Sequence, residues 1–377
     1  MGERKGAVAH LGRERPMNAS FWSGRRVFVT GHTGFKGGWL TLWLTRLGAT
    51  VGGYSLAPPT EPNLFTIAKV SDGIDHQIAD VRDLAALTAA ISRFSPEIVF
   101  HLAAQPIVRD SYLIPVETYA TNVMGTVNLL EAVRQAGGVR ATVIITSDKC
   151  YENRETIWPY REFDAMGGHD PYSSSKGCAE LVTSAYARSY FATQMGRGSV
   201  ASVRAGNVIG GGDWAKDRLM ADLMRGLMAG EPVIIRRPHS VRPWQHVLEP
   251  LSGYLAVAEH LCTNGPLAWE PWNFGPDTDS NQTVDELARL TCRLWGRPQA
   301  LQVREDPGAD HEAGLLKLDS TKARVQLGWR SRWMFSQCIT RTVEWYRALK
   351  AGNNMRAFTL GQIEAYEDAA EARGSKA

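Results

Sequence analysis

Long apolar runs, paired cysteines and a strong net charge are all missing from this sequence of 377 residues. No stretch approaches the roughly 20 apolar residues that cross a bilayer, and the N-terminus lacks the apolar core of an export signal, so we expect no membrane partner. The five cysteines are scattered without any C-x-x-C pair, which excludes a zinc site and predicts reduced thiols in the cytoplasm. A net charge of +3 gives no sign of a nucleic-acid partner.

Residues 1–17 are polar and rich in Arg, and they have no hydrophobic periodicity. We therefore expect this segment to be a disordered extension. Met17 is a candidate for the biological start, because the patterned sequence begins just after it.

From residue 25 onward, short β-rich runs alternate with segments of helical spacing. We expect strands over residues 25–30, 51–55, 75–81, 98–103, 141–147 and 201–209. Helices are expected over residues 36–47, 84–94 and 116–135, the first of them amphipathic. This alternation predicts an α/β fold, a doubly wound parallel sheet of the Rossmann type with helices on both faces.

The pattern changes after Gly210, where Gly, Pro and aromatic residues become common. We expect residues 18–210 to form the dinucleotide-binding domain, to which residues 247–276 return with a helix at 251–261 and a short strand at 272–274. Residues 211–246 and 277–353 are predicted to form a smaller C-terminal α/β domain that binds the substrate. Residues 354–377 carry weak signals and are predicted to be a C-terminal tail.

A glycine-rich loop joins the first predicted strand to the first predicted helix. Gly31 permits a tight turn, Gly34 lets the backbone approach a pyrophosphate, and Gly37 lets the helix pack closely on the strand. The phosphates would lie at a helix N-terminus, where free N–H groups and the helix dipole favour anions. The spacing is G-x-x-G-x-x-G rather than G-x-G-x-x-G. We expect Thr33, Phe35 and Lys36 to line the same cofactor site.

The second predicted strand indicates which dinucleotide binds. An acidic residue there would bind the ribose hydroxyls of NAD, but Tyr54, Ser55 and Leu56 occupy that place. No Arg is nearby to hold the 2′-phosphate of NADP, which favours NAD. Asp80 and Val81, at the end of the third strand, are candidates to contact the adenine, although Asp80 is also a common loop or helix-capping residue.

Tyr172 and Lys176 lie one turn apart on a predicted helix, for which Asp170 is the N-cap and Pro171 the first residue. A phenol with a pKa near 10 is a poor base at neutral pH. A neighbouring ammonium and an oxidised nicotinamide would stabilise the phenolate, so that Tyr172 could take a proton from a sugar hydroxyl. Ser147 ends a central strand, at the edge where doubly wound folds bind ligands, and would hydrogen-bond the reacting hydroxyl.

Three further polar residues are candidates near this edge. Asp148 and Lys149 follow Ser147 and could supply a second acid/base pair, whereas elsewhere they would be a solvated pair. Asn122 interrupts an apolar helical pattern and is costly to bury without partners. It would hold a water or the backbone in a proton relay, or else it is an ordinary capping or surface Asn.

Taken together, these motifs resemble the extended short-chain dehydrogenase/reductase family, which contains the nucleotide-sugar epimerases and dehydratases. The resemblance extends from about residue 21 to residue 353. Its segments are residues 30–37, 101–104, 147, 172–176, 204–210 and 327–329. Within the family, four segments resemble the dehydratases that act on CDP-glucose: residues 104–106, 146–151, 211–214 and 242–247. Related dTDP-glucose dehydratases carry Asp-Glu where this chain has Asp148-Lys149.

The resemblance implies a lyase that uses tightly held NAD to convert CDP-glucose to its 4-keto-6-deoxy product. Tyr172 would start oxidation at C4, Asp148 would protonate the departing C6 hydroxyl, and Lys149 would be the C5 base or stabilise the enolate. Further residues are implied as ligands of the cofactor (Leu102, Ala103, Ala104) or of the substrate (Asn207, Arg242, with Arg109 and Arg218 as further candidates).

Three alternatives share this scaffold. A 4-epimerase needs no second acid/base pair, so Asp148 and Lys149 favour the dehydratase. A catalytically silent NAD sensor would be expected to lack Tyr172 or Lys176, and both are present. A dehydratase of another nucleotide-linked glucose stays open. The family resemblance also implies a homodimer, paired through the 116–135 helix and the Tyr172 helix, and no metal.

Overall fold

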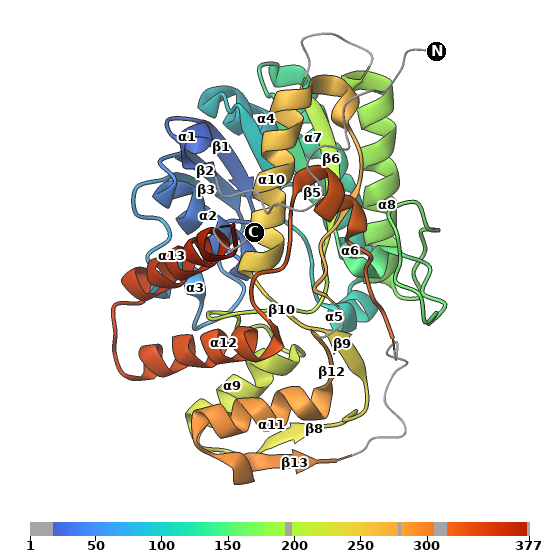
Figure 1. The fold of residues 1–377 in the computed structure, drawn as a ribbon. Coiled ribbons are helices and arrows are strands. Elements are labelled where there is room, and N and C mark those ends of the chain that lie inside the picture. The colour runs from blue at the N-terminus through green and yellow to red at the C-terminus, as the bar shows by residue number, and fades with distance from the viewer. Residues whose placement is uncertain (1–17, 193–197, 278–279, 305–314, 375–377) are drawn as a thin grey trace.

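The computed structural model describes residues 18–192, 198–277, 280–304 and 315–374. Its centre is a seven-stranded parallel sheet in the order β11-β6-β5-β4-β1-β2-β3 (Figure 1). The strands are β1 (Arg26–Thr30), β2 (Thr50–Ser55), β3 (Asp75–Ile78), β4 (Ile98–His101), β5 (Ala141–Ile145), β6 (Ser199–Arg204) and β11 (Trp272–Asn273). The predicted doubly wound parallel sheet is confirmed.

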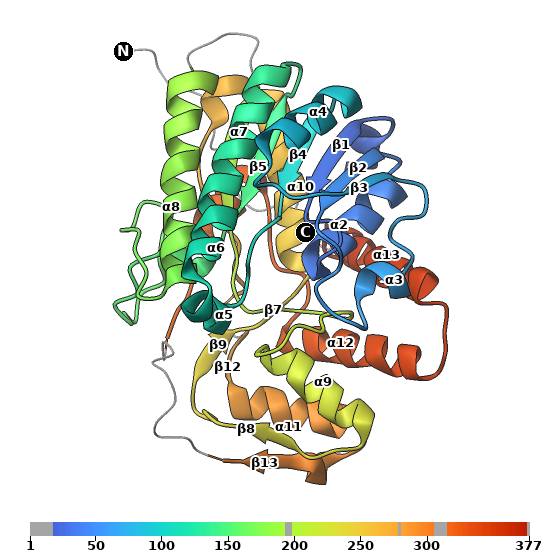
Figure 2. The same ribbon diagram turned by 180° about the vertical axis from the view of Figure 1, so that it is seen from behind.

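Helices cover both faces of this sheet (Figure 2). On one face, α4 packs against α7, and α7 against α8. On the other, α10 packs on β5, β6 and α2. The helices of these layers are α2 (Phe35–Arg46), α4 (Leu84–Phe94), α7 (Gly125–Ala136), α8 (Pro171–Tyr186) and α10 (Leu248–Asn264). Short helices connect them: α1 (Ala19–Trp22), α3 (Leu64–Ile67), α5 (Val108–Leu113) and α6 (Pro115–Tyr119).

The alternating side chains of each strand supply two separate cores. On β1, Val27 and Val29 belong to the core under α2 and α10, while Phe28 belongs to the core under α4 and α7. β5 divides in the same way, with Val143 on the first side and Ile144 on the second. A strand buried on both faces is typical of a parallel sheet covered by helices.

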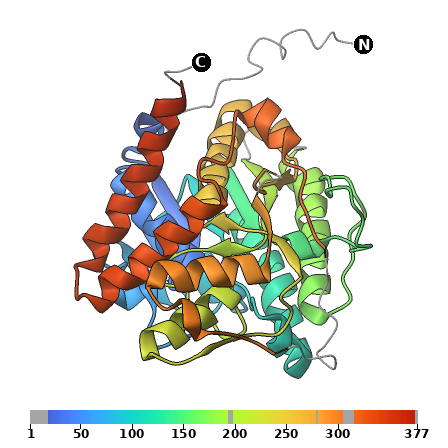
Figure 3. The ribbon, with the colours of Figure 1, turned by 60° about the horizontal axis from the view of Figure 1, so that its bottom comes forward.

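A smaller part of the chain lies below the carboxyl edge of the sheet in Figure 1, and Figure 3 shows α9 beside α11 within it. Here β9 pairs antiparallel with β12, and β8 parallel with β13. Its elements are β8 (Val233–Ile235), β9 (Val241–Pro243), β12 (Asn281–Thr283), β13 (Leu301–Val303), α9 (Leu219–Ala229), α11 (Val284–Trp295) and α12 (Phe335–Lys350). The strands β7 (Val208–Ile209) and β10 (Gln245–His246) pair where the chain enters it.

The end of the chain differs from the expected tail, because it forms the helix α13 (Met355–Gly374). This helix packs on the outer side of α2, where Glu367 accepts a hydrogen bond from Trp43 Nε1 at 2.8 Å. The amphipathic pattern expected for α2 is therefore wrong: each of residues 37–44 is buried, since α13 covers the side that would otherwise face water. None of the helices in the described ranges is long and apolar enough to cross a membrane.

The long helix expected over residues 116–135 is divided into α6, a π-helical turn η1 (Ala120–Met124) and α7. A π-turn widens the helix locally and often marks a functional site. Asn122 lies in this turn and is buried. The extension predicted for residues 1–17, with Met17, lies outside the described residues.

Candidate active site

The glycine loop leaves β1 and enters α2 with almost no room for side chains. A Cβ on Gly31 would lie 2.6 Å from the amide nitrogen of Ala103, and one on Gly37 would lie 2.1 Å from the carbonyl oxygen of Gly31. Gly31 also has φ of +77°, a conformation that residues with a Cβ rarely adopt. Gly34 differs, because a Cβ there would meet only the Gly31 oxygen, at 3.4 Å. The loop is thus closed at Gly31 and Gly37 and open at Gly34.

This shape fits a dinucleotide pyrophosphate. Gly34 is the N-cap of α2 and makes no side-chain capping hydrogen bond, so the amides of the first turn are left to donate to an anion. The backbone of Leu102 and Ala103 lies against Gly31. Thr33 Oγ1 bonds to Ser55 Oγ at 2.8 Å and donates to the Leu56 carbonyl, which fixes the loop against the end of β2.

His32 is a member of the loop that the sequence analysis did not select. It is fully buried, and burial, followed by the nearby His76, lowers its pKa to about 4. The ring fits because β2 carries Gly53, where a Cβ would lie 2.6 Å from the imidazole. A histidine between two loop glycines was the available signal, but its burial depends on Gly53 of the neighbouring strand.

Asp80 and Val81, the two candidates for contact with the adenine, differ in exposure. The Asp80 carboxylate accepts hydrogen bonds from the Arg82 amide at 2.9 Å and from its guanidinium at 2.6 and 2.8 Å, and its side chain is 27% exposed. Val81 is buried against Gly125 at the start of α7. Asp83, not Asp80, is the N-cap of α4.

Helix α8 carries the Tyr–Lys pair as expected. Asp170 is its N-cap, accepting from the Ser173 amide at 2.9 Å, and Pro171 begins it. Tyr172 and Lys176 are both buried, and the Lys176 ammonium donates to the Ile145 carbonyl at the end of β5, at 3.3 Å. Burial lowers the pKa of Lys176 to about 8.

Ser147 and Tyr172 are brought together by β5 and α8. Burial raises the pKa of Tyr172 to about 12, and a hydrogen bond with Ser147 acts in the opposite direction. The phenol is therefore a weaker acid than a free tyrosine in this structure. A positive charge beside it must offset this burial before Tyr172 acts as a base at neutral pH.

Asp148 and Lys149 lie in a 3-10 turn, η2 (Asp148–Cys150), which follows β5 after Thr146 and the N-cap residue Ser147. Asp148 is buried and accepts a hydrogen bond from Ser147 Oγ at 2.9 Å. Its carboxylate lies on the backbone of Gly206, where a Cβ would come within 1.8 Å of Oδ2. Lys149 is half-buried. The pair is therefore not a solvated surface pair, since the carboxylate is held inside the molecule.

Lys36 lies at the start of α2, directly after the glycine loop, and is influenced by the charged groups of η2 and α8. Burial lowers its pKa to about 8, and the charges that act on it next are those of Arg218, Asp148 and Lys176. These residues come from four separate elements or loops, so the structure brings together candidates that the sequence holds far apart. Asp213 completes the group and pairs with Arg218 at 3.0 Å.

Asn122 is neither a surface residue nor a helix cap. Its Oδ1 accepts from the Gln105 amide at 2.8 Å, and its Nδ2 donates to the Gln105 carbonyl at 3.1 Å and to Ser175 Oγ at 2.8 Å. Asn122 therefore holds the backbone that follows residues 102–104 against α8, and its part in a proton relay stays a prediction.

The substrate candidates do not form one cluster. Arg218 lies near Tyr172 and Lys36, but Arg109 forms a half-exposed ion pair with Asp217 at 2.6 Å. Arg242 is half-buried on β9, in the smaller part of the molecule. Asn207 has φ of +52° and its carbonyl accepts from the Gln245 amide at 3.2 Å, which joins β7 to β10.

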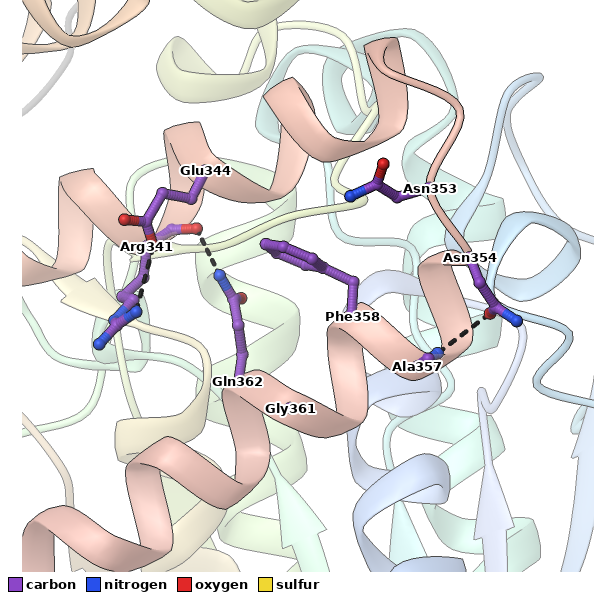
Figure 4. Close-up of a pocket in the computed structure, with 8 residues that line it drawn as sticks. All are labelled: Arg341, Glu344, Asn353, Asn354, Ala357, Phe358, Gly361 and Gln362. Atoms are coloured by element: carbon purple, nitrogen blue, oxygen red, sulfur yellow. Dashed lines mark hydrogen bonds and ion pairs between the residues drawn. The ribbon is translucent and has the colours of Figure 1, made fainter.

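A surface groove of about 620 Å³ lies between α12 and α13 and contains none of the predicted site residues (Figure 4). Phe358 and Gln362 of α13 face Arg341 and Glu344 of α12 across it, and Gln362 donates to the Arg341 carbonyl at 2.7 Å. In the ranges that the structure describes, no group of three or more His, Cys, Asp or Glu side chains could hold a metal ion.

Comparison with known proteins identifies the family. Residues 27–267 match the model of the NAD dependent epimerase/dehydratase family. The chain belongs to this family. The shape of the glycine loop, which fits a dinucleotide, and the expectation of NAD as cofactor agree with this family. The predicted family resemblance is confirmed.

Three relatives show how far the likeness extends. The CDP-glucose 4,6-dehydratase of Salmonella typhimurium strain LT2 is 54% identical over 357 residues, which cover 94% of this chain and 99% of that protein. A dTDP-glucose 4,6-dehydratase of Xanthomonas campestris is 26% identical over 84% of this chain and 92% of that protein. The structure of Thermus thermophilus UDP-glucose 4-epimerase in complex with NAD has a TM-score of 0.73 and 26% identity, and covers 85% of this chain and 99% of that one.

Proposed function

We propose that this protein is a lyase that converts CDP-glucose to CDP-4-keto-6-deoxyglucose and water. The observation that carries the proposal is the 54% identity, over 94% of the chain, to a CDP-glucose 4,6-dehydratase. The buried Asp148 beside Ser147 supports it, because elimination of water needs acid and base groups beyond those that oxidise C4.

Gly31, Thr33, Gly34, Phe35, Lys36, Gly37 and residues 102–104 would hold NAD. The bound cofactor would supply reversible hydride transfer, away from C4 and back to C6, so the net reaction would be a loss of water. Tyr172 accepts the proton of the C4 hydroxyl, and Ser147 hydrogen-bonds the same oxygen. Lys176 supplies the positive charge that favours the phenolate. Asp80 and Val81 are proposed to flank the adenine.

The second acid/base pair then acts on the 4-keto sugar. The ketone acidifies the C5 proton, so oxidation must come before elimination. Asp148 protonates the departing C6 hydroxyl, and its burial excludes competing water. Lys149 removes the C5 proton or stabilises the enolate oxygen.

The substrate's diphosphate requires cations and hydrogen-bond donors. Arg218 is the strongest candidate, because its charge acts on both Tyr172 and Lys36, and we also assign Asn207, Arg242 and Arg109 to substrate binding. Residues 211–246 and 277–353 are proposed to form the domain that covers the substrate, and residues 18–210 with 247–276 the domain that binds NAD.

The proposal is tested by assaying CDP-, dTDP-, GDP- and UDP-glucose side by side. The 4-keto product is measured by its absorbance in alkali, and water loss by mass spectrometry. We expect turnover to be highest with CDP-glucose. Higher turnover with another nucleotide would reassign the substrate, and inversion at C4 without loss of water would make the protein an epimerase.

We also propose a homodimer, paired through α6, η1, α7 and α8. Large apolar side chains are exposed on these elements: Val116 (82%), Met124 (51%) and Leu181 (61%). A monomer in light scattering at micromolar concentration would contradict the dimer. The five cysteines are all unpaired, from which we infer that the enzyme works in the cytoplasm.

A further inference from the structure

A buried ion pair lies behind the catalytic side chains and has no part in the proposed reaction. Glu180 is on α8, one turn beyond Lys176, and Arg204 ends β6. Arg204 Nη2 and Glu180 Oε2 are 2.7 Å apart, and the two side chains are 2% and 5% exposed. Removing two charges from water costs several kcal/mol per ion, so such a pair is weak evidence for stability. Its surroundings point to another role.

The ion pair holds the chain on both sides of η2. On one side, Thr146 Oγ1, in the residue before Ser147, donates to Glu180 Oε1. On the other side, Arg204 Nη1 donates to the hydroxyl of Tyr151, which directly follows η2, at 2.5 Å. Asp148 and Lys149 lie between these two anchors. The position of Asp148 and Lys149 in the turn therefore depends on Glu180 and Arg204.

The Glu180 carboxylate also acts on Lys176. Burial and then the charge of Arg204 act in opposite directions on the pKa of Glu180, which is lowered overall, so the carboxylate stays ionised. Burial lowers the pKa of Lys176, and the charge of Glu180 is the largest influence that opposes this lowering. The other titratable groups near Lys176 are Cys150 of η2, Lys36 of α2, His101 of β4 and Tyr172, one turn before it on α8. Burial raises the pKa of Tyr172 to about 12, so this phenol is neutral near pH 7.

Those neighbours do not replace the carboxylate. Burial raises the pKa of the Cys150 thiol and lowers that of His101 to about 3, so both are neutral near pH 7. Lys36 carries charge of the same sign as Lys176. Glu180 is therefore the anion that favours the protonated form of Lys176.

We propose that Glu180 and Arg204 are positioning residues for the dehydratase: together they hold the Asp148–Lys149 turn from both sides, and Glu180 places a buried carboxylate one turn from Lys176 on α8. This inference rests on the proposed function. Its two consequences concern different steps, namely the elimination, through η2, and the oxidation, through Lys176.

The test is Glu180→Gln, which keeps the size of the side chain and removes its charge. We expect the rate of NADH formation with CDP-glucose in a single turnover to fall at lower pH than in the wild type, by about half a unit or more. C5 deuterium exchange from solvent should slow about tenfold or more, because Asp148 and Lys149 lose their alignment. The ionisation of Lys176, followed by NMR of ¹³Cε-labelled lysine and assigned with Lys176→Met, should shift in the same direction.

Two further variants separate position from stability. Ser202→Ala removes another donor to the same carboxylate, 2.6 Å from Oε2, but leaves its charge, so the pH profile should stay that of the wild type. The double variant Glu180→Gln with Arg204→Met removes both charges, and so leaves no unpaired buried cation. It should be more stable than Glu180→Gln alone while the Lys176 shift persists.

Wild-type ionisation of Lys176 and wild-type C5 exchange in a folded Glu180→Gln or double variant would overturn the proposal. A shift in Ser202→Ala as large as in Glu180→Gln would also overturn it, since packing rather than charge would then be responsible. The NMR titration needs no substrate. Absence of wild-type turnover with CDP-glucose would therefore reject the proposed function while the NMR arm still decides the role of Glu180.

Discussion

The glycine loop is shaped by close contacts of its backbone, whereas the proposed catalytic edge, formed by η2 and α8, is filled with buried polar side chains. At Gly31 and Gly37 a single added carbon would overlap backbone atoms. At the catalytic edge, Asp148, Tyr172 and Lys176 are all buried within a network of hydrogen bonds and charges. The conformation of the glycine loop is therefore determined by steric exclusion, and the arrangement of side chains on η2 and α8 by electrostatics.

This difference separates the consequences of mutation in the two regions. A substitution in the loop moves the backbone, and therefore affects folding and cofactor binding before it affects chemistry. A substitution at the catalytic edge that preserves shape leaves the fold in place and changes proton transfer. The following predictions test that division, from the largest expected effect to the smallest.

Gly37→Ala should have the largest effect. The new Cβ would lie 2.1 Å from the Gly31 oxygen, so the loop backbone must shift, at a cost on the order of 3 kcal/mol in the free energy of unfolding. Gly34→Ala is the matched control, because its Cβ meets only one atom, at 3.4 Å. It should unfold like the wild type in urea and yet bind NAD more weakly by calorimetry. Equal stability of the two variants would contradict the steric account.

Tyr172→Phe should remove catalysis and spare the fold. We expect the rate of NADH formation to fall by roughly 10²–10⁴-fold, the usual contribution of a positioned acid/base group. The ring and its packing are kept, so the free energy of unfolding should change by less than about 1.5 kcal/mol. Loss of cooperative unfolding in this variant would show that the Tyr172 hydroxyl is also needed for the packing of the fold.

Lys149→Ala should leave the oxidation at C4 in place and block the elimination that follows it. Oxidation at C4 depends on Tyr172 and Ser147, so transient NADH should still form, measured by its absorbance at about 340 nm. Exchange of the C5 proton with deuterated solvent should be blocked, since either the base or the charge that stabilises the enolate is lost. Normal C5 exchange would remove Lys149 from the elimination step.

The pH dependence should report Lys176. Its pKa is lowered from 10.5 to about 8, so the ammonium is present below that pH and is lost as the pH rises through it. The oxidation rate should therefore decline above about pH 8. Lys36 has a similarly lowered pKa of about 8, so Lys36→Met is the control in which the decline should persist. The side chain of Lys176→Arg stays charged at this pH. If the oxidation rate of that variant still declined above about pH 8, the decline could not be assigned to Lys176.

Arg109→Ala should have the smallest effect on stability. Its ion pair with Asp217 is at the surface, with side chains 49% and 37% exposed, and such pairs contribute less than about 1 kcal/mol. Chemical denaturation measures this. If Arg109 binds the diphosphate, KM for CDP-glucose should rise about tenfold, which corresponds to about 1.4 kcal/mol. An unchanged KM would remove it from the substrate site.

Much of the site was predictable because its signals are local. The strand–glycine loop–helix order, the Asp170 cap and the Tyr172–Lys176 spacing each lie within a few residues, and the structure has all three. Glu180 and Arg204 were missed although both are charged, since nothing local shows that a charge on a helix will meet one on a strand. The packing of α13 on α2 was missed because the two helices are far apart in the sequence, and no local pattern shows that they meet.

The sequence by itself determined the parallel sheet, the strand–glycine loop–helix unit and the helix on which Tyr172 and Lys176 lie one turn apart, because hydrophobic periodicity, glycine spacing and helix capping act over short stretches of chain. Only the tertiary structure decided that Asp148 is buried on Gly206, that the charge of Arg218 acts on Lys36, and that Glu180 and Arg204 hold the chain on both sides of η2. The physical reason is that burial and charge pairing depend on which distant segments share a small, water-poor volume, and short-range patterns carry no record of that.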